Sequence, residues 1–309
     1  MPGAYAHLTL AGLLSASNVL DSVDNFPVAA KISILDNPNF CELGAVSPDY
    51  PYLLVVDPDS CLWADLMHHQ SIDKIIDFGV ESIRMLDGEY RSKSFAWFAG
   101  LVSHIVADMT IHPIVNLKVG PYEQNKTDHR ICEMHQDAYI FPRLNVGEVG
   151  VSEYLDGGIG ACSDERNRNK LNKTICSTWD DLLHKCYPAQ YLHGAPKIDL
   201  WHAAFYNIMN ITEEGAGLFA LARHVAVNAG LTYPRRNKID MQYISNLKTP
   251  KGEMHYDEIF DLAQGNILRI WALIAAAVYE NSNDYKGFLG EEWSLDTGLD
   301  ANNKLVFWG

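Results

Sequence analysis

Two histidines and an aspartate recur at intervals of four residues in GLVSHIVADMTIHPIVN, the stretch that spans residues 100–116. They are His104, Asp108 and His112, and most of the residues between them are apolar. Because four residues advance an α-helix by slightly more than one turn, a helix stacks these three side chains along one narrow face. Burying an ionised carboxylate costs free energy unless a cation or hydrogen-bond donors compensate its charge. The pattern therefore favours a metal site on a buried helix over three ordinary core residues.

A second motif follows one short loop later in DHRICEMHQDAYIF, residues 128–141. His129 and Glu133 are again four residues apart and share a helix face, and His135 is an alternative ligand to His129. Such a pair arises by chance on many charged helices, but here it comes soon after the first motif. Imidazole nitrogens and carboxylate oxygens suit Zn²⁺, whose catalytic sites keep a position open for water. These ligands together exceed one tetrahedral site, so the sequence predicts at least two ions.

Further candidate ligands lie upstream of both motifs. CLWADLMHHQ supplies His68 and His69, either of which could bind metal, although a surface pair is the simpler interpretation of this segment alone. SPDYPY places Asp49 in a proline-bounded turn, where aspartate is also a common turn former. His7 lies near the chain start, and Pro2 follows a methionine in a context where the initiator is usually removed. The free amine of Pro2 could then bind metal.

Periodicity indicates which elements position these residues. Apolar residues recur at intervals of three and four along most of the chain, whereas strict two-residue alternation is rare. We therefore predict an all-α fold in which one multi-helix domain spans 1–309, because no segment resembles a domain linker. Segments 36–40 and 46–60 are predicted to be turns. The predicted helices cover residues 4–16, 27–36, 71–86, 91–115, 128–141, 166–186, 197–208, 213–229 and 256–281.

The composition restricts the classes of partner. The chain has 309 residues, of which 48% are apolar and 20% charged, and its formal net charge is −15. These values are typical of a globular protein with a large core and exclude a largely disordered chain. Affinity for a polyphosphate backbone depends on Lys and Arg, so the acidic balance argues against long nucleic acids as partners. An anionic substrate would need a local positive source.

Few segments carry information about the compartment. The first residues lack the basic segment and cleavage site of a secretory signal, which predicts a cytoplasmic protein unless a leader has been removed. The longest apolar runs fall short of the roughly 20 residues that span a bilayer, so no transmembrane helix is expected. Cys162, Cys176 and Cys186 lie close together in the sequence. They would form a disulfide in a secreted protein, whereas buried free thiols are the other interpretation.

Taken in order, the motifs resemble the zinc-dependent phospholipase C and S1/P1 nuclease superfamily, an all-α fold whose members hold three zinc ions at the bottom of a cleft. PGAYAHLTLA resembles the nuclease-type beginning, and GAVSPDYPY with WADLMHH resembles the phospholipase branch. SHIVADMTIHP is similar to the corresponding run of the glycosylphosphatidylinositol-specific phospholipase D group. The resemblance covers about residues 2–140. The interval of four between Asp108 and His112 favours the phospholipase side, whereas the first residue is not the Trp of many secreted members.

This resemblance implies a cofactor set of up to three Zn²⁺ ions. Asp108 would bridge the first two ions, and Asp49 would act beside them as a general base or as a carboxylate that orients water. The implied ligand sets are His68, His104 and Asp108 for the first ion, Asp108, His7 and Pro2 for the second, and His112, His129 and Glu133 for the third.

The implied reaction is hydrolysis of a phosphoester by water that zinc activates, with phospholipase C-like cleavage of a phosphodiester as the first choice. Residues 50–54 would then line an acyl path or touch a membrane transiently, or they belong to the core. An S1/P1-like nuclease or nucleotide phosphoesterase and a small-molecule phosphoesterase of a metabolic pathway are the alternatives. A non-catalytic zinc protein fits less well, because a structural zinc site needs no spare carboxylate such as Asp49.

Overall fold

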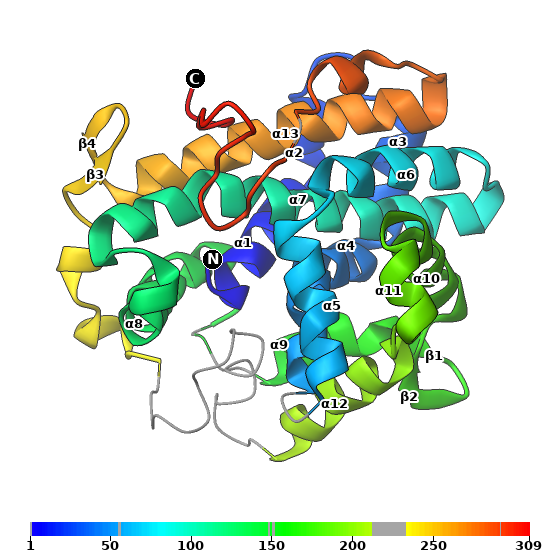
Figure 1. Ribbon diagram of the computed structural model, residues 1–309, viewed down its shortest axis with the longest axis horizontal. Coiled ribbons are helices and arrows are strands. Elements are labelled where there is room, and N and C mark those ends of the chain that lie inside the picture. The colour runs from blue at the N-terminus through cyan, green and yellow to red at the C-terminus, as the bar shows by residue number, and fades with distance from the viewer. Residues whose placement is uncertain (1, 55–56, 148, 150–151, 212–232, 291) are drawn as a thin grey trace.

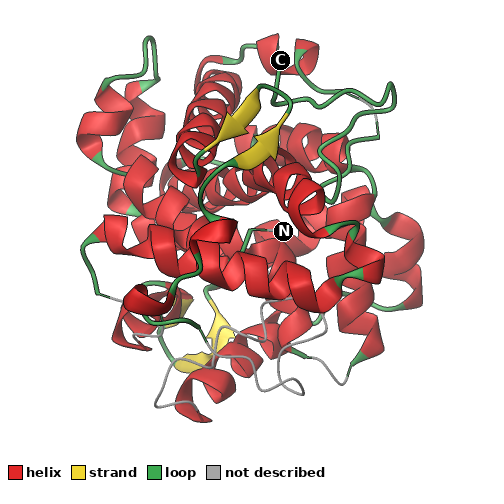
Figure 2. Ribbon diagram, turned by 90° about the vertical axis from the view of Figure 1, so that its left-hand side faces the viewer, coloured by secondary structure: helices red, strands yellow, loops and turns green. Residues whose placement is uncertain are grey.

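The computed structural model describes residues 2–54, 57–147, 149, 152–211, 233–290 and 292–309. Helices make up most of this part of the chain and pack on one another in several directions (Figures 1 and 2). Two small antiparallel hairpins lie at the edge of the molecule, one formed by β1 and β2 and the other by β3 and β4. The prediction of an all-α fold is confirmed.

The elements have the following bounds. The α-helices are α1 (Ala4–Leu14), α2 (Ser17–Asp21), α3 (Val28–Asp36), α4 (Pro38–Val46), α5 (Pro58–His69), α6 (Ile72–Arg84), α7 (Gly88–Val119), α8 (Lys126–Ile140), α9 (Ser152–Gly157), α10 (Lys173–Cys186), α11 (Pro188–His193), α12 (Ile198–Ile211) and α13 (Tyr256–Glu280). Short 3₁₀ helices include η1 (Ser47–Leu53) and η2 (Tyr122–Gln124). The strands are β1 (Ser163–Asp164), β2 (Asn167–Leu171), β3 (Leu247–Thr249) and β4 (Gly252–Met254).

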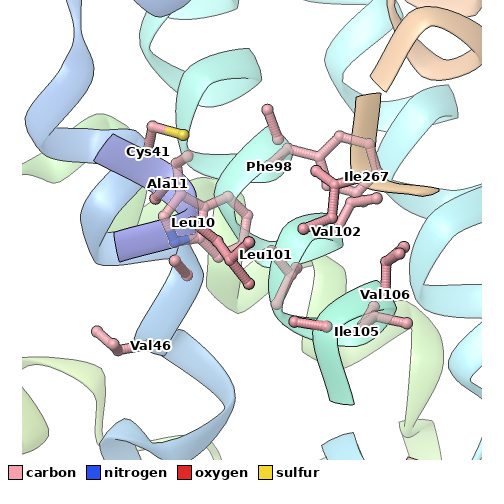
Figure 3. Close-up of a cluster of buried hydrophobic side chains, with 14 of the residues drawn as sticks. Leu10, Ala11, Cys41, Val46, Phe98, Leu101, Val102, Ile105, Val106 and Ile267 are labelled. Atoms are coloured by element: carbon pink, nitrogen blue, oxygen red, sulfur yellow. The ribbon is translucent and has the colours of Figure 1, made fainter. Parts of the chain in front are cut away.

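Helix α7 is the central element of the fold. It packs against α4, α13, α3 and α1, and every residue from Ser94 to Val115 is buried. A helix that is apolar on all sides is buried on all sides, which accounts for its place in the core. Figure 3 shows Phe98, Leu101 and Ile105 of this helix among apolar side chains of α1, α4 and α13. The polar residues of α7 therefore lie in the interior of the protein.

Two glycines allow α4 and α7 to approach each other closely. A Cβ atom on Gly44 would lie 1.9 Å from the carbonyl oxygen of Trp97, and one on Gly100 would lie 1.9 Å from that of Cys41. Real Cβ atoms do not come so close to backbone oxygens, so each position requires glycine. The close approach places the end of α4 directly beside the polar face of α7.

Several predicted elements are wrong in detail. Residues 36–40 and 46–60 were expected to form turns, but most of the described residues among them belong to α3, α4, η1 and α5, because proline fits the first turn of a helix. The predicted helix over 166–186 begins only at Lys173, after the β1–β2 hairpin. The predicted helix over 213–229 lies outside the described residues. The single domain over 1–309 stays a prediction.

Two helices bear on the expectation that no segment is long enough to span a membrane. By length and composition, α7 and α13 could cross a membrane, contrary to the expectation that no segment is long enough. The apolar stretch of α7 is 100% buried inside the protein, and that of α13 is 50% buried. Burial of this kind is also found in the core helices of globular proteins.

The structure also decides between two pairs of alternatives. All six cysteines are free, so Cys162, Cys176 and Cys186 are thiols and no disulfide joins them. Residues 50–53 are buried and Leu54 is partly buried, which favours the interpretation that these residues belong to the core.

Candidate metal centre

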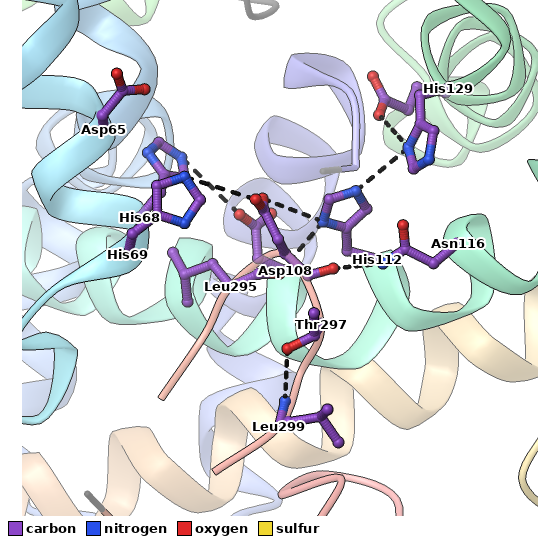
Figure 4. Close-up of polar contacts among 12 residues, drawn as sticks. Asp65, His68, His69, Asp108, His112, Asn116, His129, Leu295, Thr297 and Leu299 are labelled. Carbon is purple, nitrogen blue, oxygen red and sulfur yellow. Dashed lines mark hydrogen bonds and ion pairs between the residues drawn. The ribbon is translucent and has the colours of Figure 1, made fainter. Parts of the chain in front are cut away.

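The candidate metal centre is built on the middle of α7. His104, Asp108 and His112 are each 0% exposed. Figure 4 shows Asp108 and His112 between His68 on one side and His129 on the other. Four other elements bring further candidate ligands to this place: α1 with His7, η1 with Asp49, α5 with His68, and α8 with His129 and Glu133.

Two groups of potential ligand atoms share His104. The first contains Asp49, His68 and His104, and the second contains His7, His104 and Asp108; the atoms of each group lie within 4.8 Å of one another. Nε2 of His68 is 3.3 Å from Nε2 of His104 and 3.2 Å from Oδ1 of Asp49. In the second group, Oδ1 of Asp108 is 3.2 Å from Nε2 of His7, and its Oδ2 is 3.4 Å from Nε2 of His104.

A third group lies one turn further along α7. It contains His112, His129 and Glu133, whose ligand atoms also lie within 4.8 Å of one another. Nε2 of His112 is 3.3 Å from Nδ1 of His129, and Oε1 of Glu133 is 3.9 Å from the same Nδ1. The ring planes of the two histidines are nearly perpendicular, at 87°. Two adjacent helices thus supply one set of converging donors.

Backbone carbonyl groups orient four of the histidines. A carbonyl oxygen can only accept a hydrogen bond, so the imidazole nitrogen beside it must be the donor, and the other nitrogen of a neutral ring carries a lone pair. In every case that second nitrogen faces one of the groups described above. The pairs are His68 Nδ1 with Ala64 at 2.7 Å, His104 Nδ1 with Ala45 at 2.9 Å, His112 Nδ1 with Leu295 at 3.3 Å, and His129 Nε2 with Gly120 at 2.6 Å.

The protonation states of the buried groups suit metal binding. Burial lowers the pKa of His112 well below its usual value and lowers the pKa of His129 to about 4, so both rings are neutral at pH 7. Burial opposes ionisation of Asp108 as well, but His104 and His7 beside it outweigh this and hold its pKa well below the usual value. Burial lowers the pKa of His104, but Asp108 and Asp49 beside it outweigh this effect and raise it, so a zinc ion would displace a proton from this ring. The centre therefore contains buried negative charge, and the imidazoles of its third group are neutral.

Hydrogen bonds do not account for all of these polar atoms. Both nitrogens of His7, Oδ1 of Asp49 and both carboxylate oxygens of Asp108 are buried and have no hydrogen-bond partner among the described residues. Ligands placed about 2.1 Å from a zinc ion in a tetrahedron lie about 3.4 Å apart. The closest donor pairs in the three groups are separated by 3.2 to 3.3 Å. The donor set and its spacing therefore fit Zn²⁺.

The structure separates the alternative histidines. His68 is buried within the first group, whereas the side chain of His69 is 39% exposed and lies 3.6 Å from Asp296. His135 points away from the centre, because its Nδ1 accepts a hydrogen bond from the backbone N–H of Asp240. His68 and His129 are thus the histidines that the fold brings together with α7.

Two expected residues need separate description. Asp49 was expected beside the metal pair as a base, but its Oδ1 lies among the ligand atoms of the first group, so a ligand role is also open to it. Pro2 is buried two residues before the start of α1, and its role as an amino-terminal ligand stays a prediction.

Sequence patterns did not reveal the contribution of the C-terminal segment. The backbone N–H of Leu295 donates to the carbonyl of His68, and the carbonyl of Leu295 accepts from His112. Asp296 follows, with its Oδ1 3.7 Å from Nδ1 of His112. Leu295 acts through backbone atoms, which leave no signal in residue type, so only the structure could find it.

Comparison with known protein families gives one match. The family described as zinc dependent phospholipase C matches residues 7–189, which is more than half of the 309 residues. This range contains all of the candidate ligands except Pro2. No curated protein and no solved structure matches the chain.

Proposed function

The chain belongs to the zinc-dependent phospholipase C family, and from this premise we propose that it hydrolyses a phosphodiester bond of a phospholipid. Zinc dependence and phosphoester hydrolysis follow from the family itself. The observation that carries the proposal further is the convergence of Nε2 of His68, Nε2 of His104 and Oδ1 of Asp49, with 3.3 Å between the two nitrogens and 3.2 Å between His68 and Asp49. With each Nδ1 donating to a backbone carbonyl, both Nε2 atoms can present a lone pair to the same cation, which would also compensate the buried carboxylates.

The proposal assigns the three groups of residues to three positions for zinc. When bound, such ions polarise phosphoryl oxygens and lower the pKa of a bound water toward 7. Asp108 has one oxygen near His7 and the other near His104, so its carboxylate would join the first two positions. His112, His129 and Glu133 would hold the third.

Asp49 is the residue to which the proposal gives the handling of the proton. Burial raises the pKa of Asp49, but the adjacent His68 and His104 outweigh this effect and the net shift is downward. The carboxylate is therefore ionised at neutral pH and able to accept a proton or a hydrogen bond from water. In our proposal, Asp49 orients the attacking water in addition to contacting the first position.

A cavity beside the third group supports a substrate with an apolar part. It has a volume of about 480 Å³, and its lining is mainly apolar, with Leu117, Leu299 and Leu305 among its residues. Tyr122 also lines it, and the ring of Tyr122 lies 5.3 Å from that of His129. An apolar group of a substrate bound at the third position could occupy this cavity.

A substrate panel assayed with and without a zinc chelator tests the proposal. The panel contains phosphatidylcholine in mixed micelles, a dinucleotide, an aryl phosphodiester and a sugar phosphate. We expect release of diacylglycerol and phosphocholine, loss of this activity with the chelator, and recovery when Zn²⁺ is restored. Preferred cleavage of the dinucleotide would instead support a nuclease, and activity on the sugar phosphate alone would support a metabolic phosphoesterase.

A further inference from the structure

A buried carboxylate outside the three groups holds the beginning of α1. Oδ1 of Asp137 accepts the backbone N–H of Ala6 at 2.8 Å, and Oδ2 accepts that of Tyr5 at 3.3 Å. Asp137 is 0% exposed and belongs to α8. The first turn of a helix carries unpaired N–H groups that a side chain at the preceding residue normally satisfies. Here that residue is Gly3, which has no side chain. The carboxylate of Asp137, on α8, accepts hydrogen bonds from these N–H groups instead.

Gly3 and Asp137 fit each other sterically. A Cβ atom on Gly3 would lie 2.0 Å from Oδ2 of Asp137, so any other residue would displace the carboxylate. The carbonyl of Gly3 accepts the backbone N–H of His7 at 3.3 Å, which continues the same first turn to the candidate ligand. Asp137 therefore fixes the position of the helix turn from which His7 projects.

Asp137 is itself held in place by neighbours on the side of the third group. The hydroxyl of Tyr233 donates to Oδ2 of Asp137 at 3.0 Å, and the guanidinium of Arg130 donates to the Tyr233 oxygen at 3.2 Å. Arg130 also lies 3.8 Å from Oε2 of Glu133. Asp137 follows Glu133 by one helical turn, so α8 presents the ligand and the anchor on the same face.

From these contacts we propose that Asp137 is a positioning residue that ties α1 to α8 and so sets the distance between the His7 position and the third position. The proposal rests on the metal centre proposed above. A helix that was capped only by its own residues could move relative to α8, and His7 would move with it. Groups that orient ligands in this way typically change metal affinity about 10- to 100-fold when they are removed.

The test compares Asp137→Asn and Asp137→Ala with Glu42→Gln as a matched control. Glu42 is also a carboxylate removed from bulk solvent that accepts a tyrosine hydroxyl, that of Tyr154 at 2.9 Å, but it lies on α4 and holds no helix terminus. Zinc affinity of each variant is measured by competition with a chelating dye, and thermal unfolding is followed by circular dichroism. Neither readout requires enzymatic activity.

We expect both Asp137 variants to release about one zinc ion at a chelator concentration about 10- to 100-fold lower than wild type requires. The Glu42→Gln protein should keep the wild-type zinc affinity even if its unfolding temperature falls. Zinc affinity that is unchanged in Asp137→Asn, or that falls equally in the control, would overturn the inference. If Asp137→Ala does not fold, Asp137→Asn, which preserves the side-chain shape, decides alone. A wild-type protein without zinc would contradict the metal centre itself, and this outcome is distinguishable from the others.

Discussion

Nε2 of His68 and Nε2 of His104 face each other at 3.3 Å in the interior of the protein. Neither nitrogen needs a proton in the neutral rings, because Nδ1 of each ring donates to a backbone carbonyl. In that state both Nε2 atoms carry lone pairs, and one zinc ion could accept both of them. The relation between these two residues is repeated by His112 and His129 on the other side of Asp108.

The adjacent histidines at the end of α5 offer a direct comparison. Replacement His68→Ala removes a buried donor from the first group, and we expect zinc affinity and kcat/KM to fall at least about 100-fold. Replacement His69→Ala removes a half-exposed ring outside the group and should change both by less than about threefold. Zinc titration and steady-state kinetics of the two proteins provide the check. Equal losses in both variants would mean that the fold does not select His68.

Asp49 carries the proton-handling role in the proposed reaction. The replacement Asp49→Asn keeps the shape of the side chain but removes its charge, so we expect kcat to fall by about 10²- to 10⁴-fold. Since Oδ1 of Asp49 lies among the ligand atoms, zinc affinity should also fall, though by less than for His68→Ala. Asp65→Asn is the control, because Asp65 accepts a hydrogen bond from Tyr52 and belongs to none of the groups. Unchanged turnover in Asp49→Asn would exclude this role.

The contact of α4 with α7 controls the orientation of His104 through the carbonyl of Ala45. Adding a methyl group in Gly100→Ala would place Cβ 1.9 Å from the carbonyl oxygen of Cys41. We expect a loss of about 1–3 kcal/mol in the free energy of unfolding and a weaker first zinc position. Gly265→Ala on α13 meets nothing within 4 Å and should gain about 0.5–1 kcal/mol, because alanine favours helix. Urea unfolding measures the free energy of unfolding of both variants. A stable Gly100→Ala protein would show that the two helices can separate without cost.

Glu42 gives the protein a pH dependence that is independent of metal. Burial raises the pKa of Glu42 from 4.5 to about 7, so the folded protein holds this proton more tightly than the unfolded chain. The free energy of unfolding therefore falls as the pH rises from about 4.5 to about 7, by roughly 3 kcal/mol from this group, and then levels off. Glu42→Gln should remove that part of the decline. Urea unfolding of zinc-free protein at pH 5 and pH 8 gives the comparison, and an identical decline in both proteins would contradict the prediction.

The spacing of residues could predict the ligands on α7 and α8, because His104, Asp108 and His112 occupy one face of any helix. Spacing could not choose between His68 and His69, since the packing of α5 decides which of two neighbours turns inward. The prediction at Pro38 was wrong as well. This residue was interpreted as part of a turn, but it occupies the first turn of α4. Proline is compatible with that position because no N–H is needed there.

Other parts of the centre depend on tertiary contacts that leave little trace in the sequence. The carbonyls of Ala45, Ala64 and Leu295 orient three histidines through backbone atoms, and any residue type offers such an atom. The sequence offers one indication of Asp137, which is its position one helical turn after Glu133. That the carboxylate reaches the beginning of α1 could not be predicted without the arrangement of the helices.

The zinc content of the purified protein tests the central claim most directly. Plasma mass spectrometry should find about three zinc ions per chain in the wild type, and about one fewer in His112→Ala, because only the third group is lost. The remaining ions should stay bound, since His68, His104 and Asp108 are unaffected. Fewer than about two zinc ions per wild-type chain, or the same content in His112→Ala, would contradict the account.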